Sequence, residues 1–231
     1  MTDINSSKAP KPVKVMIGLP IAAHCFPAET VEALLNLKVP PSMFARVVSG
    51  QAVDKARNYL VRIALEQGVT HLFFLDDDNP PPPETLGRLL QADKDIITVP
   101  ILTRNEPYTP CIFKKVDISD KTKVPGYVHI EKIDTSGGDV VQVDACGMAC
   151  TLIKREVLEK LYPKYEGSPF AFTRDTIDPP VDGKNKRDMS EDVVFCERAK
   201  KEGFTVWCDT AIRPKHYSGY KYVQFNDSMI L

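Results

Sequence analysis

The chain has 231 residues, and 43% of them are hydrophobic, which is enough to fill the core of one large α/β domain or two small ones. Thirty basic and 31 acidic residues leave a formal net charge of −1, and this balance argues against nucleic acid or an anionic membrane as the main partner. Apolar runs stay below the roughly 18 residues of a membrane span, and the polar start lacks the apolar stretch of a secretory signal, so a cytoplasmic protein without a transmembrane segment is expected.

Strand and helix patterns alternate up to about residue 100, after a polar segment at 1–12 that is expected to be a flexible tail. Short apolar runs predict strands at 13–19, 43–48, 71–75 and 95–100. Periodic apolar residues predict helices at 27–37, 53–67 and 84–91, the first with an apolar stripe of Val31, Leu34 and Leu35. This alternation predicts a sheet sandwiched between helices and joined by right-handed crossovers.

The first predicted strand ends without the glycine pattern of dinucleotide-binding loops. Its exit reads Gly18-Leu19-Pro20-Ile21-Ala22-Ala23-His24. Because this is not Gly-x-Gly-x-x-Gly, a diphosphate bound at this edge needs another counter-charge. His24 is a candidate ligand contact, and a loop histidine without a role explains it equally well.

One face of the helix predicted at 53–67 carries polar residues. Asp54, Arg57 and Asn58 stand at i, i+3 and i+4, so they share the first turns of that helix near the carboxyl ends of the strands. An arginine there can meet a nucleotide base or phosphate. A solvated helix face is the alternative.

Three carboxylates, Asp76, Asp77 and Asp78, end the third strand and are followed by Asn79 and four prolines at 80–83. Alternate strand residues point the same way about 6.6 Å apart, so Asp76 and Asp78 are candidate ligands of one cation while Asp77 points elsewhere. The prolines end the strand and open a helix, which holds the acids at the edge where open α/β sheets bind ligands. A solvated acidic turn is the alternative.

The pattern changes in the second half, where an antiparallel extension is expected from strand-like pieces at 110–116, 126–133 and 140–143. The small apolar segment 144–153, with Gly147, allows close backbone approach and precedes a helix at 154–161. Six cysteines form no Cys-x-x-Cys pair and are expected to be reduced core residues. The charged segment 175–188 is expected to be a mobile loop that acts as a lid.

Ser190 is the expected N-cap of the last long helix, which Gly203 ends. Glu191 and Asp192 stand in its first turn, where the helix dipole alone favours acids. Strands are expected at 204–208 and 212–216, the second ending in His216.

The order of these features resembles GT-A-fold glycosyltransferases, and the chain is most similar to glycosyltransferase family 2 and its relatives over about 13–220. The two most specific stretches are Phe74-Leu75-Asp76-Asp77-Asp78-Asn79-Pro80 and Ser190-Glu191-Asp192-Val193-Val194-Phe195-Cys196. The resemblance implies a Rossmann-like, nucleotide-binding mixed sheet flanked by helices. It also implies a single domain at 13–220, with a nucleotide-sugar-binding half at 13–103, an acceptor half at 104–220 and a C-terminal tail at 221–231.

The resemblance further implies a hexosyltransferase-type enzyme that moves a sugar from a UDP- or GDP-sugar to a glycan, lipid-linked or small-molecule acceptor. Asp192 matches the base of inverting members, and Glu191 would position the acceptor. A divalent ion, Mn²⁺ or Mg²⁺, would neutralise the diphosphate, and an imidazole ligand favours manganese somewhat. Its expected ligands are Asp76, Asp78 and His216. The expected nucleotide contacts are Pro20, Asp54, Arg57, Asn58, Asp76 and Asp77.

Several alternatives stay open from the sequence. Retaining GT-A enzymes share the acids and the histidine. A sugar-nucleotide pyrophosphorylase would need a Gly-rich, basic loop after the first strand, and a haloacid-dehalogenase-type phosphatase would not follow Asp-x-Asp with Asn79 and prolines. A non-catalytic sugar-nucleotide or glycan-binding module would keep the cleft and have no need of Asp192.

Overall fold

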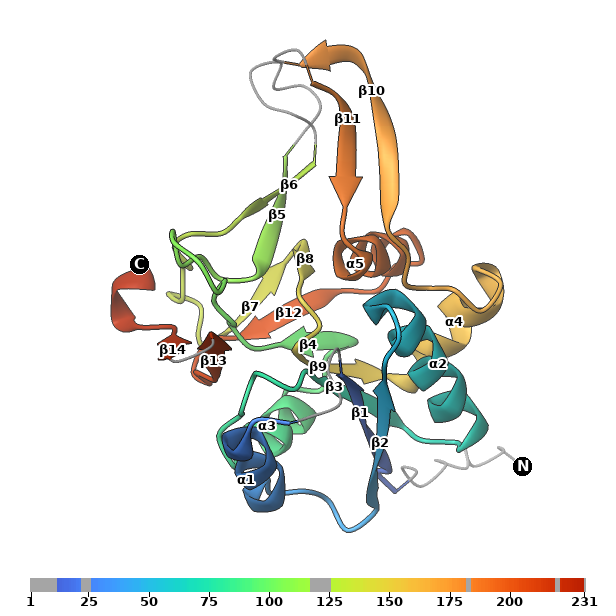
Figure 1. Ribbon diagram of the computed structural model, residues 1–231, viewed down its shortest axis with the longest axis vertical. Helices are drawn as coiled ribbons and strands as arrows, with labels where there is room; N and C mark the ends of the chain where they lie inside the picture. Colours follow the sequence, from blue (N-terminus) through green and yellow to red (C-terminus); the bar gives the residue numbers. More distant parts are fainter. Residues whose placement is uncertain (1–11, 22–25, 117–125, 182–183, 219–220, 231) are drawn as a thin grey trace, which may run out of the picture.

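The structure is a computed structural model, and it describes residues 12–21, 26–116, 126–181, 184–218 and 221–230. Its centre is a seven-stranded mixed sheet in the order β2-β1-β3-β9-β4-β12-β7 (Figure 1). Helices α2, α4 and α5 pack on one face of this sheet, and α1 and α3 lie on the other. The predicted fold class, a mixed α/β sheet flanked by helices with small antiparallel sheets beside it, is confirmed.

The first half follows the predicted alternation closely. Its elements are β1 (Val15–Ile21), α1 (Ala28–Asn36), β2 (Met43–Ser49), α2 (Val53–Glu66), β3 (His71–Leu75), α3 (Thr85–Ala92) and β4 (Ile96–Thr98). Strand β1 runs parallel to β2 on one side and to β3 on the other. The carboxyl ends of β1 and β3 therefore meet at one edge of the sheet.

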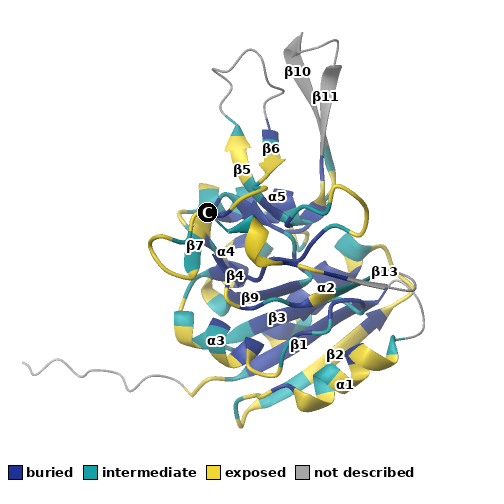
Figure 2. Cartoon of the chain, turned by 90° about the vertical axis from the view of Figure 1, so that its left-hand side faces the viewer, coloured by how far each residue is buried: buried dark blue, intermediate teal, exposed yellow. Residues whose placement is uncertain are grey.

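The apolar stripe expected on α1 is only partly confirmed, since Leu34 packs against the core whereas Val31 and Leu35 lie at the surface. Val31 is 41% exposed and Leu35 is 82% exposed, whereas Thr30 is buried (Figure 2). The Thr30 hydroxyl donates to the backbone oxygen of Asp77 at 2.6 Å. This hydrogen bond turns the Thr30 side of the helix, rather than the predicted stripe, toward the end of β3.

The second half completes the main sheet as well as the expected extension. Strand β9 (Cys150–Lys154) lies antiparallel between β3 and β4, and β12 (Val206–Asp209) continues the sheet parallel to β4. Strand β7 (Val140–Val143), expected in the extension, is instead the antiparallel edge of the main sheet. The extension itself is a three-stranded sheet of β6 (Gly126–His129), β5 (Ile112–Val116) and β8 (Ala145–Cys146).

The second half contains two further helices. Helix α4 (Arg155–Lys164) directly follows β9, and α5 (Glu191–Lys201) precedes β12. Among the described residues, every helix is too short or too polar to cross a membrane.

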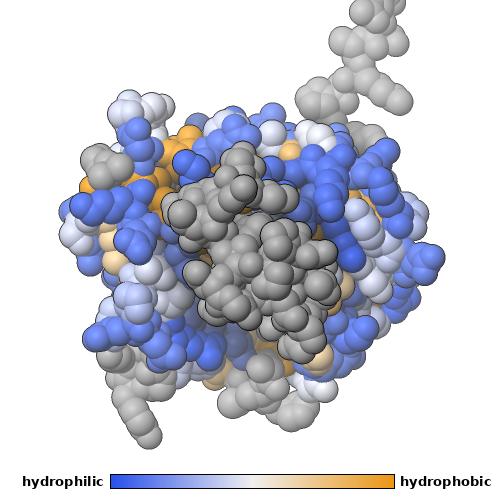
Figure 3. All heavy atoms as spheres, turned by 90° about the horizontal axis from the view of Figure 1, so that it is seen from above, coloured by the Kyte–Doolittle hydropathy of each residue, from blue (hydrophilic) through white to orange (hydrophobic). Residues whose placement is uncertain are grey.

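The segment expected to be a mobile loop at 175–188 is instead a hairpin as far as it is described, and that expectation is corrected. Strands β10 (Thr173–Val181) and β11 (Lys184–Met189) pair antiparallel and project from the body of the protein (Figure 1). Pairing the two arms gives their backbone groups partners without a core. Seen from this end, the coloured surface around the hairpin is mostly hydrophilic, with hydrophobic residues in small groups (Figure 3).

The expected C-terminal tail at 221–231 is packed onto the fold over its described residues. Strand β14 (Lys221–Gln224) pairs with β13 (Lys215–Ser218), and a short 3-10 helix, η1 (Asp227–Met229), follows. Phe225 is only 2% exposed, and Ile230 forms a β-bridge with Ile133. Burial of the Phe225 side chain and partial burial of Ile230 hold this segment against the fold.

Asn58, on α2, connects this helix to the chain that follows α4. Its amide nitrogen donates to the backbone oxygen of Phe170 at 2.8 Å, and its amide oxygen accepts from the Phe170 backbone N–H at 2.9 Å. The Phe170 ring stacks on Phe195, with 4.2 Å between centroids, and meets Phe74 edge-on. Asn58 therefore stabilises the core, because it fixes the backbone of Phe170 beside these three rings.

Replacing Asn58 with alanine should destabilise the protein by about 2 to 4 kcal/mol, because a buried N–H and a buried carbonyl both lose their partner. Urea unfolding followed by circular dichroism measures this change. Asn36→Ala is the matched control, since that amide caps an exposed carbonyl of its own helix at Glu32. A loss below about 0.5 kcal/mol in Asn58→Ala would show that Phe170 finds other partners.

Candidate functional site

The acidic triplet that follows β3 is held in place through its backbone by three separate parts of the chain. The N–H of Asp76 donates to the oxygen of Ala149 at 2.9 Å, next to β9. The oxygen of Asp77 accepts from Thr30 on α1, and the oxygen of Asp78 accepts from the N–H of Tyr217 on β13 at 2.8 Å. The triplet is therefore a fixed turn, which leaves its side chains for other contacts.

Asp76 is paired with Arg57 of α2, a residue only 3% exposed. Two guanidinium nitrogens of Arg57 donate to the two carboxylate oxygens of Asp76 at 3.1 Å each. Its third nitrogen, Nε, donates to Glu191 at 3.3 Å, and the guanidinium lies 5.3 Å from the centre of the Phe74 ring. Arg57 thus joins α2, the end of β3 and the start of α5.

The charged groups around Arg57 shift the pKa of Arg57 and the pKa of Glu191. Burial by itself would lower the pKa of Arg57, but Asp76, Glu191 and Asp192 outweigh burial and raise it. Burial and the nearby Asp192 raise the pKa of Glu191, against the opposing effect of Arg57. One buried cation therefore pairs with a buried carboxylate, Glu191, and a half-buried one, Asp76.

Asp78 faces a different pair of partners. Its Oδ2 accepts from a terminal nitrogen of Arg104 and lies 3.4 Å from Nε2 of His216. Arg104 Nε lies 3.0 Å from the same His216 nitrogen. Burial raises the pKa of Asp78, but hydrogen bonds and charge from His216, when its imidazole is protonated, and from Arg104 outweigh burial and hold that pKa below its ordinary value.

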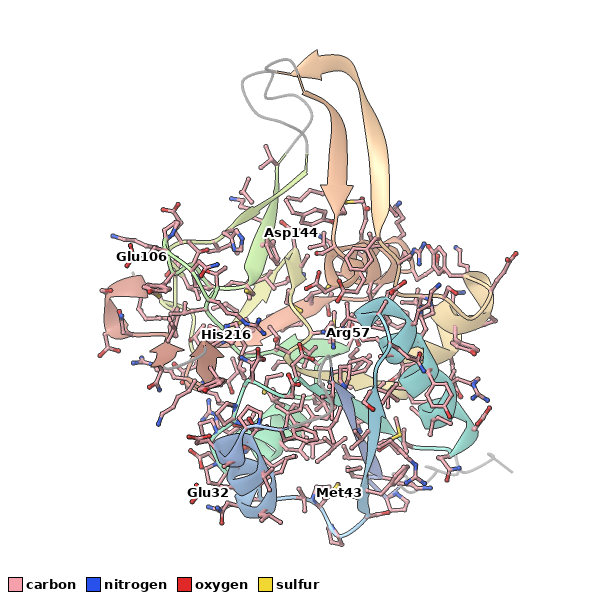
Figure 4. The ribbon with its side chains drawn as sticks, viewed as in Figure 1. Glu32, Met43, Arg57, Glu106, Asp144 and His216 are labelled. Carbon is pink, nitrogen blue, oxygen red and sulfur yellow. The ribbon has the colours of Figure 1, made fainter. Side chains whose placement is uncertain are left out.

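The hydrogen bonds of His216 assign its tautomer. Nδ1 contacts the backbone oxygen of Leu102, which can only accept, so Nδ1 carries a proton. Nε2 accepts from Arg104 and therefore presents a lone pair. A histidine whose Nδ1–H is held by a carbonyl while Nε2 stays basic has the arrangement of a metal ligand. Figure 4 shows Arg57, on α2, and His216, on β13, on either side of the region above the central sheet.

Two pockets meet at the acids. The larger has a volume of about 420 Å³, and Asp78, His216 and Asp192 are among its lining residues. The smaller, about 200 Å³, lies between the end of β1 and the start of α2. The residues that line both pockets are Asp76, Asp78 and Arg104. The same two acids and the same arginine therefore line both pockets.

Asp192 stands at the start of α5 on the wall of the larger pocket. Its Oδ1 accepts from the Val193 N–H at 2.8 Å and from the Ser190 hydroxyl. Ser190 is the N-cap residue of α5, as expected, but its hydroxyl contacts Asp192 and makes no capping hydrogen bond to a helix N–H. A side-chain carbon added at Gly147 would stand 3.6 Å from Oδ2 of Asp192, so this glycine keeps the space beside that oxygen open.

The predicted site residues are only partly brought together. Those that line a pocket are Pro20, Arg57, Asp76, Asp77, Asp78, Asp192 and His216. Those that line neither of the two pockets are Asp54, Asn58 and Glu191.

The placements outside the pockets have physical reasons. Asn58 binds the Phe170 backbone, and Glu191 is buried against Arg57. The expectation that Glu191 positions the acceptor does not fit this burial. Asp54 forms an ion pair with Lys55 at 3.9 Å. His24 lies outside the described residues.

The three expected metal ligands, Asp76, Asp78 and His216, do not form one cluster. Across the described ranges, no three His, Cys, Asp or Glu side chains gather closely enough to hold a metal ion. Both carboxylate oxygens of Asp76 accept hydrogen bonds from Arg57, which pairs this expected ligand with α2. Asp78 Oδ2 and His216 Nε2, 3.4 Å apart and both in contact with Arg104, are donor types that bind divalent ions and fit two positions around one ion. The remaining positions would have to come from a ligand or water.

Arg104 is the site residue that the sequence interpretation missed. It lies in the loop after β4, two residues past Leu102, and lines both pockets. A signal was present, because a basic residue just beyond a strand's carboxyl end lies at the edge where α/β sheets bind ligands.

Comparisons with known proteins show the fold and leave the chemistry open. The sequence matches no family model, and it matches no curated protein. Among solved structures, the chain is similar to the crystal structure of A197 from STIV, with a TM-score of 0.54 and 16% sequence identity. The similarity covers 93% of this chain and 95% of that chain. At this identity it shows a shared mixed α/β fold, so a function has to be argued from the residues of the site.

Proposed function

We propose that the protein is a GT-A-type glycosyltransferase that moves a sugar from a nucleotide-sugar donor to an acceptor hydroxyl. The observation that carries this proposal is the meeting of two pockets at Asp76, Asp78 and Arg104, with Asp192 on the wall of the larger one. A donor has two parts, a nucleoside and a sugar, joined by a diphosphate. The two pockets are joined by a charged strip, formed by the shared residues Asp76, Asp78 and Arg104, and this arrangement matches that division.

The nucleoside is assigned to the smaller pocket. It is lined by Pro20 and Ile21 from β1, by Gln51 and Val53 at the start of α2, and by the acids. Carboxylates are suitable acceptors for ribose hydroxyls, and the apolar side chains suit the face of a base. The transferred sugar and the acceptor are then assigned to the larger pocket, beside Asp192.

The diphosphate needs positive charge, because Asp76, Asp77 and Asp78 would repel it. Burial, together with Asp78 and Asp76, raises the pKa of Asp77, a sign of crowded negative charge. Arg104 supplies one cation at the strip that the two pockets share. Asp78 and His216 are proposed to hold a divalent ion, Mn²⁺ or Mg²⁺, which when bound neutralises the charge that develops on the leaving diphosphate.

Asp192 is proposed as the base. Its carboxylate takes the proton of the acceptor hydroxyl as the hydroxyl oxygen forms a bond to the anomeric carbon. The bond from that carbon to the diphosphate oxygen breaks, and its electron pair leaves with the nucleoside diphosphate. Attack opposite the leaving group inverts the anomeric configuration, and the anomeric proton coupling in the NMR spectrum of the product distinguishes inversion from retention.

The proposal is tested by a thermal-shift screen of UDP-, GDP-, CDP- and dTDP-sugars with and without manganese. A ligand at about 100 times its Kd adds about 2.7 kcal/mol to the stability of the folded state, which gives a clear shift. We expect one base to stabilise the protein far more with manganese than without it, and the same mixture plus an acceptor to release nucleoside diphosphate. Stabilisation without release would indicate a non-catalytic binding module. No stabilisation by any donor would contradict the proposal.

Asp78→Ala and His216→Ala should each remove most of the manganese-dependent part of that stabilisation, because each deletes one of the two side chains placed to bind the ion. The readout is the difference in melting temperature with and without manganese at fixed nucleoside diphosphate. His71→Ala and Asp93→Ala are matched controls, since His71 begins the same strand β3 and Asp93 pairs with Lys154 away from the pockets. If His216→Ala keeps the full manganese effect, His216 is not a ligand.

A further inference from the structure

Arg104 stands where a divalent ion would stand between Asp78 and His216. One of its nitrogens donates to Oδ2 of Asp78, and another donates to Nε2 of His216 at 3.0 Å. These are the same two acceptor atoms that lie 3.4 Å apart and fit one cation. A guanidinium and a metal ion cannot use the same lone pairs at once, so the two compete for this position.

The two arginines that meet the acids differ in how firmly they are held. The side chain of Arg57 is 4% exposed and is fixed by Asp76 and Glu191. The side chain of Arg104 is 58% exposed, although its partners Asp78 and His216 are each only 12% exposed. Withdrawing Arg57 would uncover buried charge, whereas Arg104 can move through solvent without opening the core.

The location of Arg104 also defines where its guanidinium can go. It lines both pockets, at the strip assigned above to the diphosphate. Arginine binds phosphate oxygens through paired, charge-assisted hydrogen bonds. A small movement away from Asp78 and His216 therefore leaves it beside the anion that accompanies the metal.

We propose that Arg104 is a resident cation that occupies the Asp78–His216 pair until a divalent ion displaces it, and that its guanidinium then binds the diphosphate. The diphosphate part rests on the proposed function, and the displacement part concerns the metal alone. The consequence is coupling between the two ligands. A metal that arrives by itself must expel a guanidinium, whereas a metal that arrives with a diphosphate provides that guanidinium with a new partner.

The test is a titration with manganese chloride alone, in which free Mn²⁺ is followed by electron paramagnetic resonance. Arg104→Gln should bind manganese about tenfold or more tightly than the wild type, because the competing cation and its hydrogen bonds are gone. Arg104→Lys, which keeps the charge but cannot donate to both partners through a planar group, should lie between the two. In the presence of saturating manganese, Arg104→Gln should bind inorganic pyrophosphate several-fold more weakly than the wild type.

Arg62→Gln is the matched control for the loss of one positive charge, since Arg62 pairs with Glu66 on the exposed side of α2. It should bind manganese as the wild type does. Adding His216→Ala to Arg104→Gln should abolish the gain, which shows that the gain arises at this pair of residues. Equal manganese affinity in the wild type, Arg104→Gln and Arg104→Lys would overturn the proposal. A gain in manganese affinity without binding of any donor would support the displacement and contradict the proposed function.

Discussion

Asp192→Asn should lower sugar transfer by about 10² to 10⁴-fold while donor and metal binding stay close to those of the wild type. Asparagine keeps the shape of the side chain and can still accept from the Val193 N–H, but it cannot take up a proton. The donor and metal contacts proposed above lie at Asp78, Arg104 and His216 and do not require this carboxylate. The measurement is nucleoside diphosphate release at saturating donor, together with donor affinity from thermal shifts.

The competing explanation for Asp192 is electrostatic stabilisation of the first turn of α5. In that case Asp192→Asn would lower stability by a few tenths to about 1 kcal/mol and spare turnover. Glu197→Gln is the matched control on the same helix, because Glu197 pairs with Lys115 at 3.2 Å and does not line the pocket. Near-normal transfer by a folded Asp192→Asn protein would leave a retaining mechanism or another base.

Arg57→Met should destabilise the protein by about 3 to 5 kcal/mol, the cost of removing one partner from a buried ion-pair network. The change leaves the carboxylates of Asp76 and Glu191 without their shared cation, and the Glu191 side chain is only 8% exposed. Denaturant unfolding at neutral pH measures the loss. Arg62→Met, at an exposed pair, should cost less than about 1 kcal/mol.

The effect of Arg57→Met should depend on pH in a defined direction. Burial and Asp192 already raise the pKa of Glu191, and removal of Arg57 takes away an opposing effect, so that pKa rises further. A carboxyl whose folded pKa exceeds its unfolded value loses stability as the pH rises from the unfolded value to the folded one. The loss in free energy of unfolding caused by Arg57→Met should therefore be smaller near about pH 5 than near about pH 8. A loss in free energy of unfolding that does not depend on pH would show that lost packing, rather than uncompensated charge, causes the destabilisation.

The sequence by itself determined the elements whose signals are local. The apolar run of β3, the acids that end it and the prolines after it are contiguous, and α2 carries a regular helical period. Both elements formed within a residue or two of their predicted bounds. The position of Arg57 near the acids was also predictable, because a helix that starts beside the carboxyl edge of a sheet presents its first turns there.

Only the tertiary structure decided which polar residues reach the pockets. Asp54, Arg57 and Asn58 share a helix face, yet Arg57 meets Asp76, Asn58 meets Phe170, and Asp54 lines neither pocket. Glu191 and Asp192 are neighbours in one helical turn, but Glu191 is buried against Arg57 while Asp192 faces a pocket. Side chains one position apart point about 100° apart on a helix, and their surroundings come from remote segments.

Local sequence patterns also did not predict which segments far apart in the chain pair with each other. Strand β9 inserts between β3 and β4 although its sequence reads only as a short apolar run, and Arg104 meets Asp78 and His216 across 26 and 112 positions of the chain. Local periodicity reports which face of a segment is apolar, and it carries no information about which distant segment covers that face. The acids, the helix before them and the helix after them were therefore readable from the sequence, whereas the partner of each carboxylate was decided by the packing of segments far apart in it.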